Sequence, residues 1–336
     1  MEVNRDRAER KAAEAFQASG LHDDDAALVA EVLVTADASG KGSHGLLRLP
    51  RYARGIEHGN INPEGTIETV RETNATVTID GGSRPGSVVA ATAMGIAMDR
   101  ADQHGIGAVG VQNSTHLGML GYYTQKARSD GYIAIGMTNT EPAMPPYGGA
   151  NPVLGTNPLA IGLPTDPPFN LDMSTSSIAR GTLLRKKEAG ETIPEGVALD
   201  ATGEPTKDPA AALEGTILPF GGPKGSGLAI AVEILAGGLV GAAMGRNVKG
   251  TYHTENECTK GDFFMVIDPV ALGGETFVDQ ASNFLTDLKN EKTASGIDAV
   301  RLPGERTIER EAGAQTITVE DEIWEAVCTR ADEMKQ

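Results

Sequence analysis

The sequence predicts an α/β protein whose central sheet is covered by helices on both faces. Short runs rich in apolar and β-branched residues, such as IGAVGV at 106–111 and YIAIGMT at 132–138, alternate along the chain with longer segments of helical periodicity. Strands and helices that interleave in this way favour a sheet buried between layers of helices. The chain contains neither an internal repeat nor a low-complexity linker, and its 42 glycines indicate many tight turns.

The N-terminal region is expected to be helical. A second helical segment starts at Ser43, in SHGLLRLPRYARGIEHG. In it His44, Arg48 and Arg51 recur at i, i+4 and i+7, a spacing that places them on one helix face. Pro50 is expected to break or restart this helix, because proline lacks an N–H and clashes with the preceding turn.

From residue 66 onward, predicted strands and helices alternate. The predicted strands are 66–70, 75–80, 106–111, 132–138, 159–164, 169–173 and 262–268. The predicted helices are 87–103, 177–189, 225–244, 275–291 and 319–334. The segment 191–222 is rich in proline and glycine and is expected to meander over the surface.

The charge of the chain excludes one class of partner. A net charge of −17 argues against nucleic-acid binding, because a protein that neutralises phosphates needs a basic face. Lysine is scarce, with 12 Lys against 17 Arg, and the acids are spread along the chain. A dispersed acidic surface suits a salt-rich cytoplasm, where self-repulsion is screened. Ordinary acidic solubility explains the same composition equally well.

The chain is expected to be cytoplasmic and not bound to a membrane. Two cysteines are too few for a disulfide framework, and a reducing interior fits them. The first residues, MEVNRDRAERKAAEAF, are charged and helical in pattern, unlike a signal peptide. The apolar run 228–245 contains Glu233 and reads as a buried helix rather than a membrane span.

Two of the six histidines stand out as candidates for chemistry. His116 follows the predicted strand 106–111, at the edge of a sheet where ligands gather, and can exchange a proton near neutral pH. A histidine that caps the next helix is the structural alternative. His44, with Ser43 and Arg48, forms a second candidate group. The Arg48 guanidinium matches a carboxylate in two parallel hydrogen bonds, although an ordinary exposed helix residue is equally compatible with the pattern.

No metal site is expected. None of the histidines forms an HExxH motif or a close set of His and Cys ligands. The segment HTENEC at 253–258 contains residue types that bind metals, but a polar loop is the simpler interpretation.

Three glycine-rich or hydroxyl-rich loops are candidates for binding anions and ribose. The loops 138–160 and 172–181 follow strands and offer hydroxyls and free backbone N–H groups, although such clusters are usually turns. The third, FGGPKGSGLAIAVE at 220–233, fails both phosphate templates. Lys224 precedes Gly225 and Ser226, which reverses the Walker A order, and Ile230 fills the third glycine position of the Rossmann fingerprint.

Several blocks in one order resemble the malate/L-lactate/sulfolactate dehydrogenase family, which is distinct from the Rossmann-fold lactate and malate dehydrogenases. They are SHGLLRLPRY, STHLGMLGYY, TNTEPAMPPYGG, LGTNPLA, LDMSTSSIARG, ALEGTILPFGGPKGSGLA, CTKGDFF and RLPGER. The resemblance runs from about residue 20 to the C-terminus and is strongest to the archaeal sulfolactate/malate branch. The chain departs from many relatives at Ser226, where they have an aromatic residue, and at Ser87, where they have Gln.

The resemblance implies a non-Rossmann fold with a mixed central sheet, an NAD(P) cofactor bound in an extended form, and a homodimer with its active sites near the interface. It implies that 66–289 is the dinucleotide-binding core and that the helical region 1–65 packs with 290–336. His116 matches the acid/base of the family, and Ser43, His44 and Arg48 match the group around substrate and nicotinamide. The positions that match the cofactor lining are Thr140, Asn157, Asp172, Met173, Ser174, Thr175, Lys224, Pro303, Gly304 and Glu305.

The resulting hypothesis is reversible hydride transfer between the nicotinamide and the C2 carbon of a 2-oxo/2-hydroxy acid. His116 exchanges the proton, and Arg48 clamps the C1 carboxylate. The archaeal branch implies a second acidic group on the substrate, as in sulfolactate or malate, for which Arg51 and Arg180 are the candidate partners. NAD is favoured over NADP, because Glu305 repels a 2′-phosphate, whereas Arg306 would attract one.

Three alternatives stay open from the sequence. Two keep the fold and change the substrate: a ureidoglycolate dehydrogenase, or a reductase of cyclic imino acids such as piperideine or pyrroline carboxylate. The third is a nucleotide-binding protein without turnover. The broken Walker order argues against hydrolysis of a nucleotide.

Overall fold

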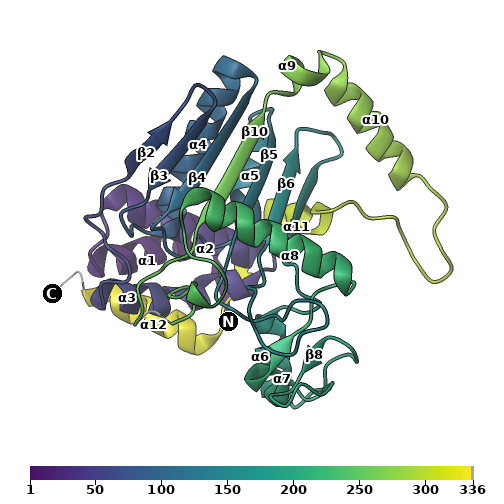
Figure 1. Cartoon of the computed structure of the whole chain (residues 1–336). Helices are drawn as coiled ribbons and strands as arrows, with labels where there is room; N and C mark the ends of the chain where they lie inside the picture. The colour runs from purple at the N-terminus through teal and green to yellow at the C-terminus, as the bar shows by residue number, and fades with distance from the viewer. Residues whose placement is uncertain (254, 334–336) are drawn as a thin grey trace.

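The computed structural model describes residues 1–253 and 255–333, and a seven-stranded mixed sheet forms its centre (Figure 1). The strand order is β2-β3-β4-β10-β5-β6-β7. The strands are β2 (Glu68–Glu72), β3 (Thr76–Asp80), β4 (Ile106–Gln112), β5 (Ile133–Thr138), β6 (Leu159–Leu163), β7 (Phe169–Met173) and β10 (Asp262–Ile267). The predicted mixed sheet is confirmed, because β3 and β4 are parallel and all the other pairs are antiparallel.

The central strand of the sheet comes from late in the sequence. β10 lies between β4 and β5, and Asp262 at its start stands opposite both Val111 and Thr138. Phe264 and Val266 of β10 point to the same side as Val109 and Val111 of β4, and all four are fully buried. A strand with neighbours on both sides needs such a continuous apolar face.

Helices cover both faces of the sheet, as predicted. α4 (Gly86–His104) and α5 (Leu120–Ser129) pack on one face, and α8 (Pro223–Ala236) lies across the other (Figure 1). α8 is shorter than the predicted helix, because the chain turns at Gly237 into a 3-10 turn. By length and composition alone, 223–240 is apolar enough to cross a membrane. Glu233 within it is, however, buried among hydrogen-bond donors of this chain.

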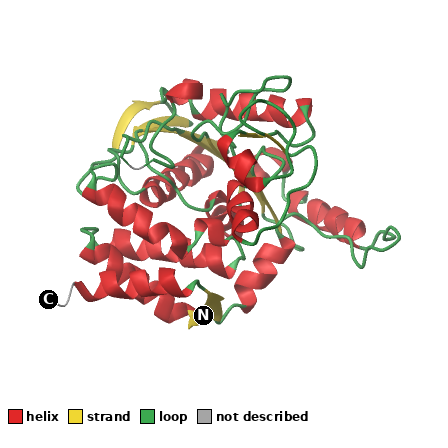
Figure 2. Cartoon of the chain, turned by 90° about the horizontal axis from the view of Figure 1, so that it is seen from below, coloured by secondary structure: helices red, strands yellow, loops and turns green. Residues whose placement is uncertain are grey.

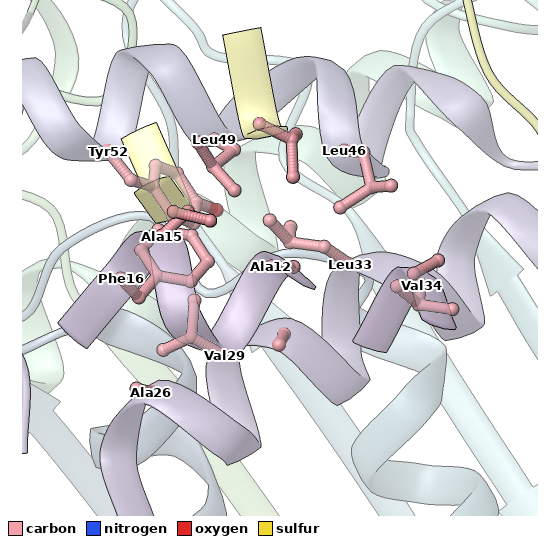
Figure 3. Close-up of a cluster of buried hydrophobic side chains, with 14 of the residues drawn as sticks. Ala12, Ala15, Phe16, Ala26, Val29, Leu33, Val34, Leu46, Leu49 and Tyr52 are labelled. Atoms are coloured by element: carbon pink, nitrogen blue, oxygen red, sulfur yellow. The ribbon is translucent and has the colours of Figure 1, made fainter. Parts of the chain in front are cut away.

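The two ends of the chain meet in a second layer. β1 (Glu2–Asn4) pairs antiparallel with β11 (Thr316–Thr318), and α1 (Arg5–Ala18) packs between α2 (Asp23–Ala38) and α12 (Asp321–Asp332). Figure 2 shows these helices as a layer beside the sheet. Phe16 of α1 and Leu33 of α2 are buried in one apolar cluster with Leu49 and Tyr52 of α3 (Leu49–Glu57; Figure 3).

The segment 191–222 is more ordered than the sequence suggested. It contributes β8 (Ala198–Leu199), α7 (Pro209–Glu214) and β9 (Thr216–Ile217), which pack with α6 (Arg180–Glu188). Leu183 of α6 is fully buried in a small apolar cluster with Ile193, Ala198, Ala212 and Ile217. These widely spaced apolar residues carry no periodic signal, and so the sequence predicted only a meander.

The remaining helices lie along the C-terminal part of the chain. α9 (Pro269–Gly273) and α10 (Phe277–Lys289) follow β10, and α10 with the loop after it extends away from the rest of the molecule in both views (Figures 1 and 2). α11 (Glu305–Gly313) then brings the chain back to β11.

Candidate active site

The segment that follows α2 carries most of the predicted catalytic residues. It forms two 3-10 turns, Gly42–His44 and Leu46–Arg48, before α3 (Leu49–Glu57) begins. The expectation of one continuous helical face is therefore wrong, since only Arg51 lies in α3. Pro50 in the first turn of α3 accounts for the restart, because proline fits the start of a helix but not its interior.

Asp37 of α2 anchors these two turns. Its carboxylate accepts the backbone N–H of Leu46 at 2.8 Å, and Gly45 packs so closely that a Cβ there would lie 1.9 Å from Oδ1. Burial raises the pKa of this carboxyl to about 7, while the hydrogen bond from Leu46 acts in the opposite direction. Asp37 therefore fixes the turns that carry Ser43, His44 and Arg48.

His116 lies beyond the end of β4 and meets His44 there. The His116 Nδ1 atom accepts the backbone N–H of Gly118 at 3.1 Å and lies 2.6 Å from the Tyr52 hydroxyl. A backbone N–H can only donate, so Nδ1 is an acceptor, and this network assigns the proton of the neutral ring to Nε2. The His44 ring stacks on the His116 ring with centroids 5.9 Å apart.

Burial and positive charge keep both imidazoles neutral at neutral pH. The pKa of His116 lies well below the ordinary histidine value, first because the ring is buried and then because Arg48 is close. Burial followed by the charge of Arg48 lowers the pKa of His44 to about 4. A neutral His116 is ready to accept a proton, and an anion bound nearby would offset the charge that lowers its pKa.

Three arginines beside the histidines lack a counter-ion. Arg48 donates from Nε to the carbonyl oxygen of Ser43 at 2.8 Å, and the guanidinium carbons of Arg51 and Arg180 lie 4.2 Å and 4.8 Å from the centre of the Tyr252 ring. Nη1 of Arg51 and Nε of Arg180 are buried without a hydrogen-bond partner. Among the described residues no carboxylate forms an ion pair with any of the three. Buried donors without acceptors are costly, so this cluster is suited to receive an anion.

α6 approaches the catalytic turns through Gly181. A Cβ at Gly181 would lie 2.9 Å from the Cβ of Ser43, so a side chain there would push α6 away. The Ser43 hydroxyl in turn lies 3.1 Å from Nδ1 of His44. This close contact places Arg180, the first residue of α6, next to the turns that carry the histidine and Arg48.

One group of the residues predicted to line the cofactor is joined by hydrogen bonds. The backbone N–H of Thr140 donates to Asn157 Oδ1 at 3.2 Å, and the N–H of Thr156 donates to the Thr140 hydroxyl at 3.0 Å. The Thr175 hydroxyl donates to the carbonyl of Thr156 at 2.9 Å. The N–H of Phe220 donates to the carbonyl of Thr175 at 3.0 Å, which brings the glycine-rich loop to the same place.

Asn157 acts within the protein rather than at its surface. The residue is fully buried, with φ at +28°, and Nδ2 donates to Glu233 Oε2 at 2.6 Å. Glu233 also accepts from Asn139 Nδ2 at 3.0 Å and from the N–H of Gly245 at 2.8 Å. Because its amide is used internally, Asn157 holds Thr140 and α8 in place.

A second group of predicted cofactor residues lies around a small cavity. Lys41 forms an ion pair with the Asp172 carboxylate and also donates to the Asp172 carbonyl at 3.4 Å. Lys41, Asp172, Pro303 and Gly304 are among the residues that line a cavity of about 110 Å³ beside this pair. β7, which ends at Met173, connects this group to Thr175 and thus to the first group.

Glu305 is already engaged in this conformation. Its carboxylate forms an ion pair with Lys289 at 2.5 Å and accepts the backbone N–H of Leu302 at 3.0 Å. The hydrogen bond from Lys289 holds the pKa of this carboxyl below its usual value. A ribose hydroxyl would therefore have to compete with Lys289 for Glu305.

The glycine-rich loop presents Lys224 at the surface. Lys224 is exposed in the first turn of α8, whereas Ser226 is buried and accepts the N–H of Tyr147 at 2.9 Å. The Ser226 hydroxyl thus holds the neighbouring loop. Ser174 follows Met173 and lies 2.8 Å from the hydroxyl of Ser176.

The HTENEC segment includes residue 254, which lies outside the described residues; 253 and 255–258 belong to no helix or strand. His253 lies 3.3 Å from Glu255 and 4.0 Å from Glu141. Within residues 1–253 and 255–333, no three His, Cys, Asp or Glu side chains are grouped so that they could hold a metal ion.

Comparison with known proteins assigns the chain to a family. The malate/L-lactate dehydrogenase family matches residues 3–328. The chain belongs to this family. It is 46% identical over 288 residues to the L-sulfolactate dehydrogenase of Methanocaldococcus jannaschii, a match that covers 85% of this chain and 83% of that protein. The solved structure of the sulfolactate dehydrogenase from the same organism superposes with a TM-score of 0.95 at 40% identity and covers 100% of this chain and 98% of that one.

More distant relatives in the family carry different cofactor names. The (2R)-3-sulfolactate dehydrogenase (NADP(+)) of Chromohalobacter salexigens is 35% identical, with 91% of each chain covered. The ureidoglycolate dehydrogenase (NAD(+)) of Escherichia coli K12 is also 35% identical, with 93% of this chain and 91% of that protein covered. Family membership makes this chain an oxidoreductase with a nicotinamide cofactor. The alternative of a nucleotide-binding protein without turnover is therefore not supported.

Sequence reasoning missed several residues of the site. Tyr52 carried a usable signal, since it continues the spacing of His44 and Arg48 along the same segment. Lys41 carried none, because its partner Asp172 lies 131 residues away. The buried ion pair of Lys260 with Asp262 was also not predicted from the sequence. The positive charge of Lys260 contributes to the lowered pKa of His116.

Proposed function

We propose that this dehydrogenase transfers a hydride reversibly between NAD(P)H and the C2 carbon of a 2-oxo/2-hydroxy acid that carries a second acidic group. Sulfopyruvate/sulfolactate and oxaloacetate/malate are the two pairs of this kind that suit the site. The observation that carries the proposal is the cluster of Arg48, Arg51 and Arg180 without counter-ions beside the histidine pair. The names of the related dehydrogenases support the same class of substrate.

The residues around the proposed cofactor site fit a dinucleotide in their chemistry. Within the proposed cofactor site, Lys41 and Lys224 offer positive charge to the phosphates of the dinucleotide. Thr140 and Ser174 offer hydroxyls to its ribose groups. When bound, the cofactor supplies the hydride or accepts it. NAD is the expected form, because a ribose hydroxyl that displaces Lys289 can donate to the Glu305 carboxylate, whereas this carboxylate repels a 2′-phosphate.

His116 is the proposed acid and base. In the free enzyme Tyr52 and Gly118 hold Nδ1 and leave Nε2 for the substrate, so the ring first takes up a second proton at Nδ1, where the Tyr52 oxygen accepts its hydrogen bond. In reduction this doubly protonated ring donates its Nε2 proton to the oxygen that becomes the hydroxyl and stays neutral with its proton on Nδ1; in oxidation that tautomer takes the proton back at Nε2. General acid and base catalysis of this kind contributes about 10²–10⁴-fold to the rate.

The arginines divide the recognition of the substrate. The charge of Arg48 lowers the pKa of both His44 and His116, which indicates that Arg48 is close to both rings. Arg48 clamps the C1 carboxylate and holds the carbonyl in place. Arg51 and Arg180 both lie against the Tyr252 ring and receive the second acid. Two anionic groups on one substrate would satisfy the donors that the free enzyme leaves unpaired.

A substrate panel tests this function. Initial rates of NADH and NADPH oxidation are compared for sulfopyruvate, oxaloacetate, pyruvate and a cyclic imino acid, at low and at molar salt; ureidoglycolate is tested in the oxidative direction. We expect a kcat/KM at least 10-fold higher for the oxo acids with two acidic groups than for pyruvate. A preference for ureidoglycolate, the substrate named for the E. coli relative, or for the imino acid would refute the proposal.

Two variants test the residue roles. His116→Ala is expected to lower kcat by about 10²-fold or more, whereas Arg48→Gln should mainly raise KM. Near-normal turnover of His116→Ala at saturating substrate would remove His116 from the mechanism.

The chain is also proposed to act as a homodimer. Ile230 and Ile234 on α8 and Phe284 on α10 are 41%, 53% and 60% exposed, which is unusual for large apolar side chains. Light scattering after size exclusion should give twice the chain mass, and Ile234→Asp should shift it towards the monomer. A monomeric wild type would refute the assembly.

The acidic surface and the two free thiols suit a reducing, salt-rich cytoplasm. Screening of the −17 net charge should then raise the unfolding temperature steadily from low to molar KCl. A midpoint that does not change with salt would leave ordinary acidic solubility as the explanation.

A further inference from the structure

Tyr252 joins two parts of the chain that are far apart in sequence. Its ring contacts the guanidinium of Arg51 from α3 and that of Arg180 from α6, at 4.2 Å and 4.8 Å. The two arginines therefore lie against one aromatic ring. Aromatic rings attract cations through their electron-rich faces, so a single ring holds both guanidinium groups where their like charges alone would drive them apart.

The backbone around Tyr252 is fixed independently of the arginines. The N–H groups of Tyr252 and His253 donate to Glu141 Oε1 at 2.8 Å and 3.3 Å, and the N–H of Glu141 donates to the Thr251 hydroxyl at 3.3 Å. Glu141 directly follows Thr140, one of the proposed cofactor residues. The ring is thus positioned from the cofactor side and in turn positions the arginines of the substrate side.

The positive charges of Arg51 and Arg180 act on the phenol of Tyr252. Burial opposes its ionisation, yet the charges of Arg180 and Arg51 hold its pKa below the ordinary tyrosine value. Nη1 of Arg51 and Nε of Arg180 remain buried without an acceptor. Tyr252 therefore orders the two guanidinium groups, and the unpartnered Nη1 of Arg51 and Nε of Arg180 are left for a ligand.

We propose that Tyr252 is a specificity-determining positioning residue, which holds Arg51 and Arg180 as a pair and so selects substrates that carry a second anionic group. This inference rests on the proposed function and adds the residue that sets the geometry of the distal-anion site. Tyr252 acts through the arginines and takes no part in proton or hydride transfer.

Three variants separate this role from a general structural one. Tyr252→Leu removes the aromatic face, Tyr252→Phe keeps it, and Glu255→Ala alters the same loop at an exposed carboxylate that pairs with His253. For Tyr252→Leu we expect KM for oxaloacetate or sulfopyruvate to rise at least 10-fold with kcat within about 3-fold. kcat/KM for pyruvate should stay within about 3-fold, and the other two variants should resemble the wild type on every substrate.

A binding measurement gives a readout that needs no turnover. Calorimetric titration of the NADH-loaded enzyme compares malonate, which carries two carboxylates, with oxamate, which carries one. Tyr252→Leu should weaken malonate binding at least 10-fold and oxamate binding less than 3-fold.

Equal losses for malonate and oxamate, or a Tyr252→Phe variant as impaired as Tyr252→Leu, would overturn the role of Tyr252. A wild type that prefers pyruvate to the substrates with two acids would instead refute the proposed function, and it would do so before any variant is made. The two failures are therefore distinguishable.

Discussion

The contact between Gly45 and Asp37 makes a quantitative prediction. A Cβ on Gly45 would lie 1.9 Å from Asp37 Oδ1 and 2.2 Å from its Cγ. The backbone of Gly45 itself is ordinary, with φ at −89°, so alanine is excluded only by the carboxylate. To reach the 3.4 Å that separates Oδ1 from a Cβ at Gly42, the turn or the carboxylate must move by about 1.5 Å (3.4 − 1.9).

Such a shift should be felt in catalysis more than in binding of the cofactor. The turns around Gly45 carry His44 and Arg48, and a displacement of about 1 Å at a reacting site costs about 10²-fold in rate. We therefore expect Gly45→Ala to lower kcat/KM about 100-fold. Loss of the hydrogen bond from Leu46 to the buried carboxylate of Asp37 should also lower the free energy of unfolding by about 1–3 kcal/mol.

A double-mutant cycle supplies the control. Gly42→Ala introduces the same methyl group in the same segment at an ordinary contact distance and should stay within about 2-fold of the wild type. Asp37→Ala made together with Gly45→Ala removes the clash and should recover part of the activity that Gly45→Ala loses. Steady-state kinetics and thermal unfolding are measured for the wild type, Gly42→Ala, Gly45→Ala, Asp37→Ala and the double variant. If Gly45→Ala behaves like Gly42→Ala, the reasoning from this contact is wrong.

Three further predictions concern groups behind the reacting atoms. Tyr52→Phe, which loses the hydroxyl at His116 Nδ1, should lower kcat about 10-fold with little change in KM, and a change in KM alone would contradict this. Lys260→Met, which strands the buried carboxylate of Asp262, should lower the free energy of unfolding in urea by about 3–5 kcal/mol, whereas Lys260→Met/Asp262→Leu should recover most of it. In oxo-acid reduction, the pKa of His116 read from the pH profile of kcat should exceed the one read from the pH profile of kcat/KM, because a bound anionic substrate offsets the charges that lower this pKa. Identical pKa values in the two profiles would count against this coupling.

The fold was largely predictable because its signals are local. Alternation and apolar runs located the strands of the sheet to within a few residues, and the family blocks supplied the mixed topology. The position of β10 between β4 and β5 has no local signal, since it depends on Asp262 pairing with Val111 and Thr138. The small cluster around Leu183 was missed for the same reason, because its apolar residues are scattered among polar ones.

The site was predictable in its residue types and less so in their connections. His116 was singled out by its place after a strand, but its contact with Tyr52 spans 64 residues and follows only from the packing of α3. Glu233 was recognised as an acid that breaks an apolar run, yet its role as an acceptor for Asn139 and Asn157 needs three separate segments. Such bonds are set by tertiary structure and leave no pattern in the sequence.

The uncompensated positive charge of the site links recognition to proton transfer. Burial, and after it the positive charge of Arg48 and Arg51, lowers the pKa of His116 in the free enzyme, so that the ring is neutral before substrate arrives. We infer that the anionic groups of the substrate, by neutralising these arginines, raise the pKa of His116 and favour its protonated form when an oxo acid is bound. A substrate with two acids neutralises more of this charge than pyruvate does. The proposed preference for a second acid and the proposed proton donation by His116 would then be two consequences of the same arginine cluster.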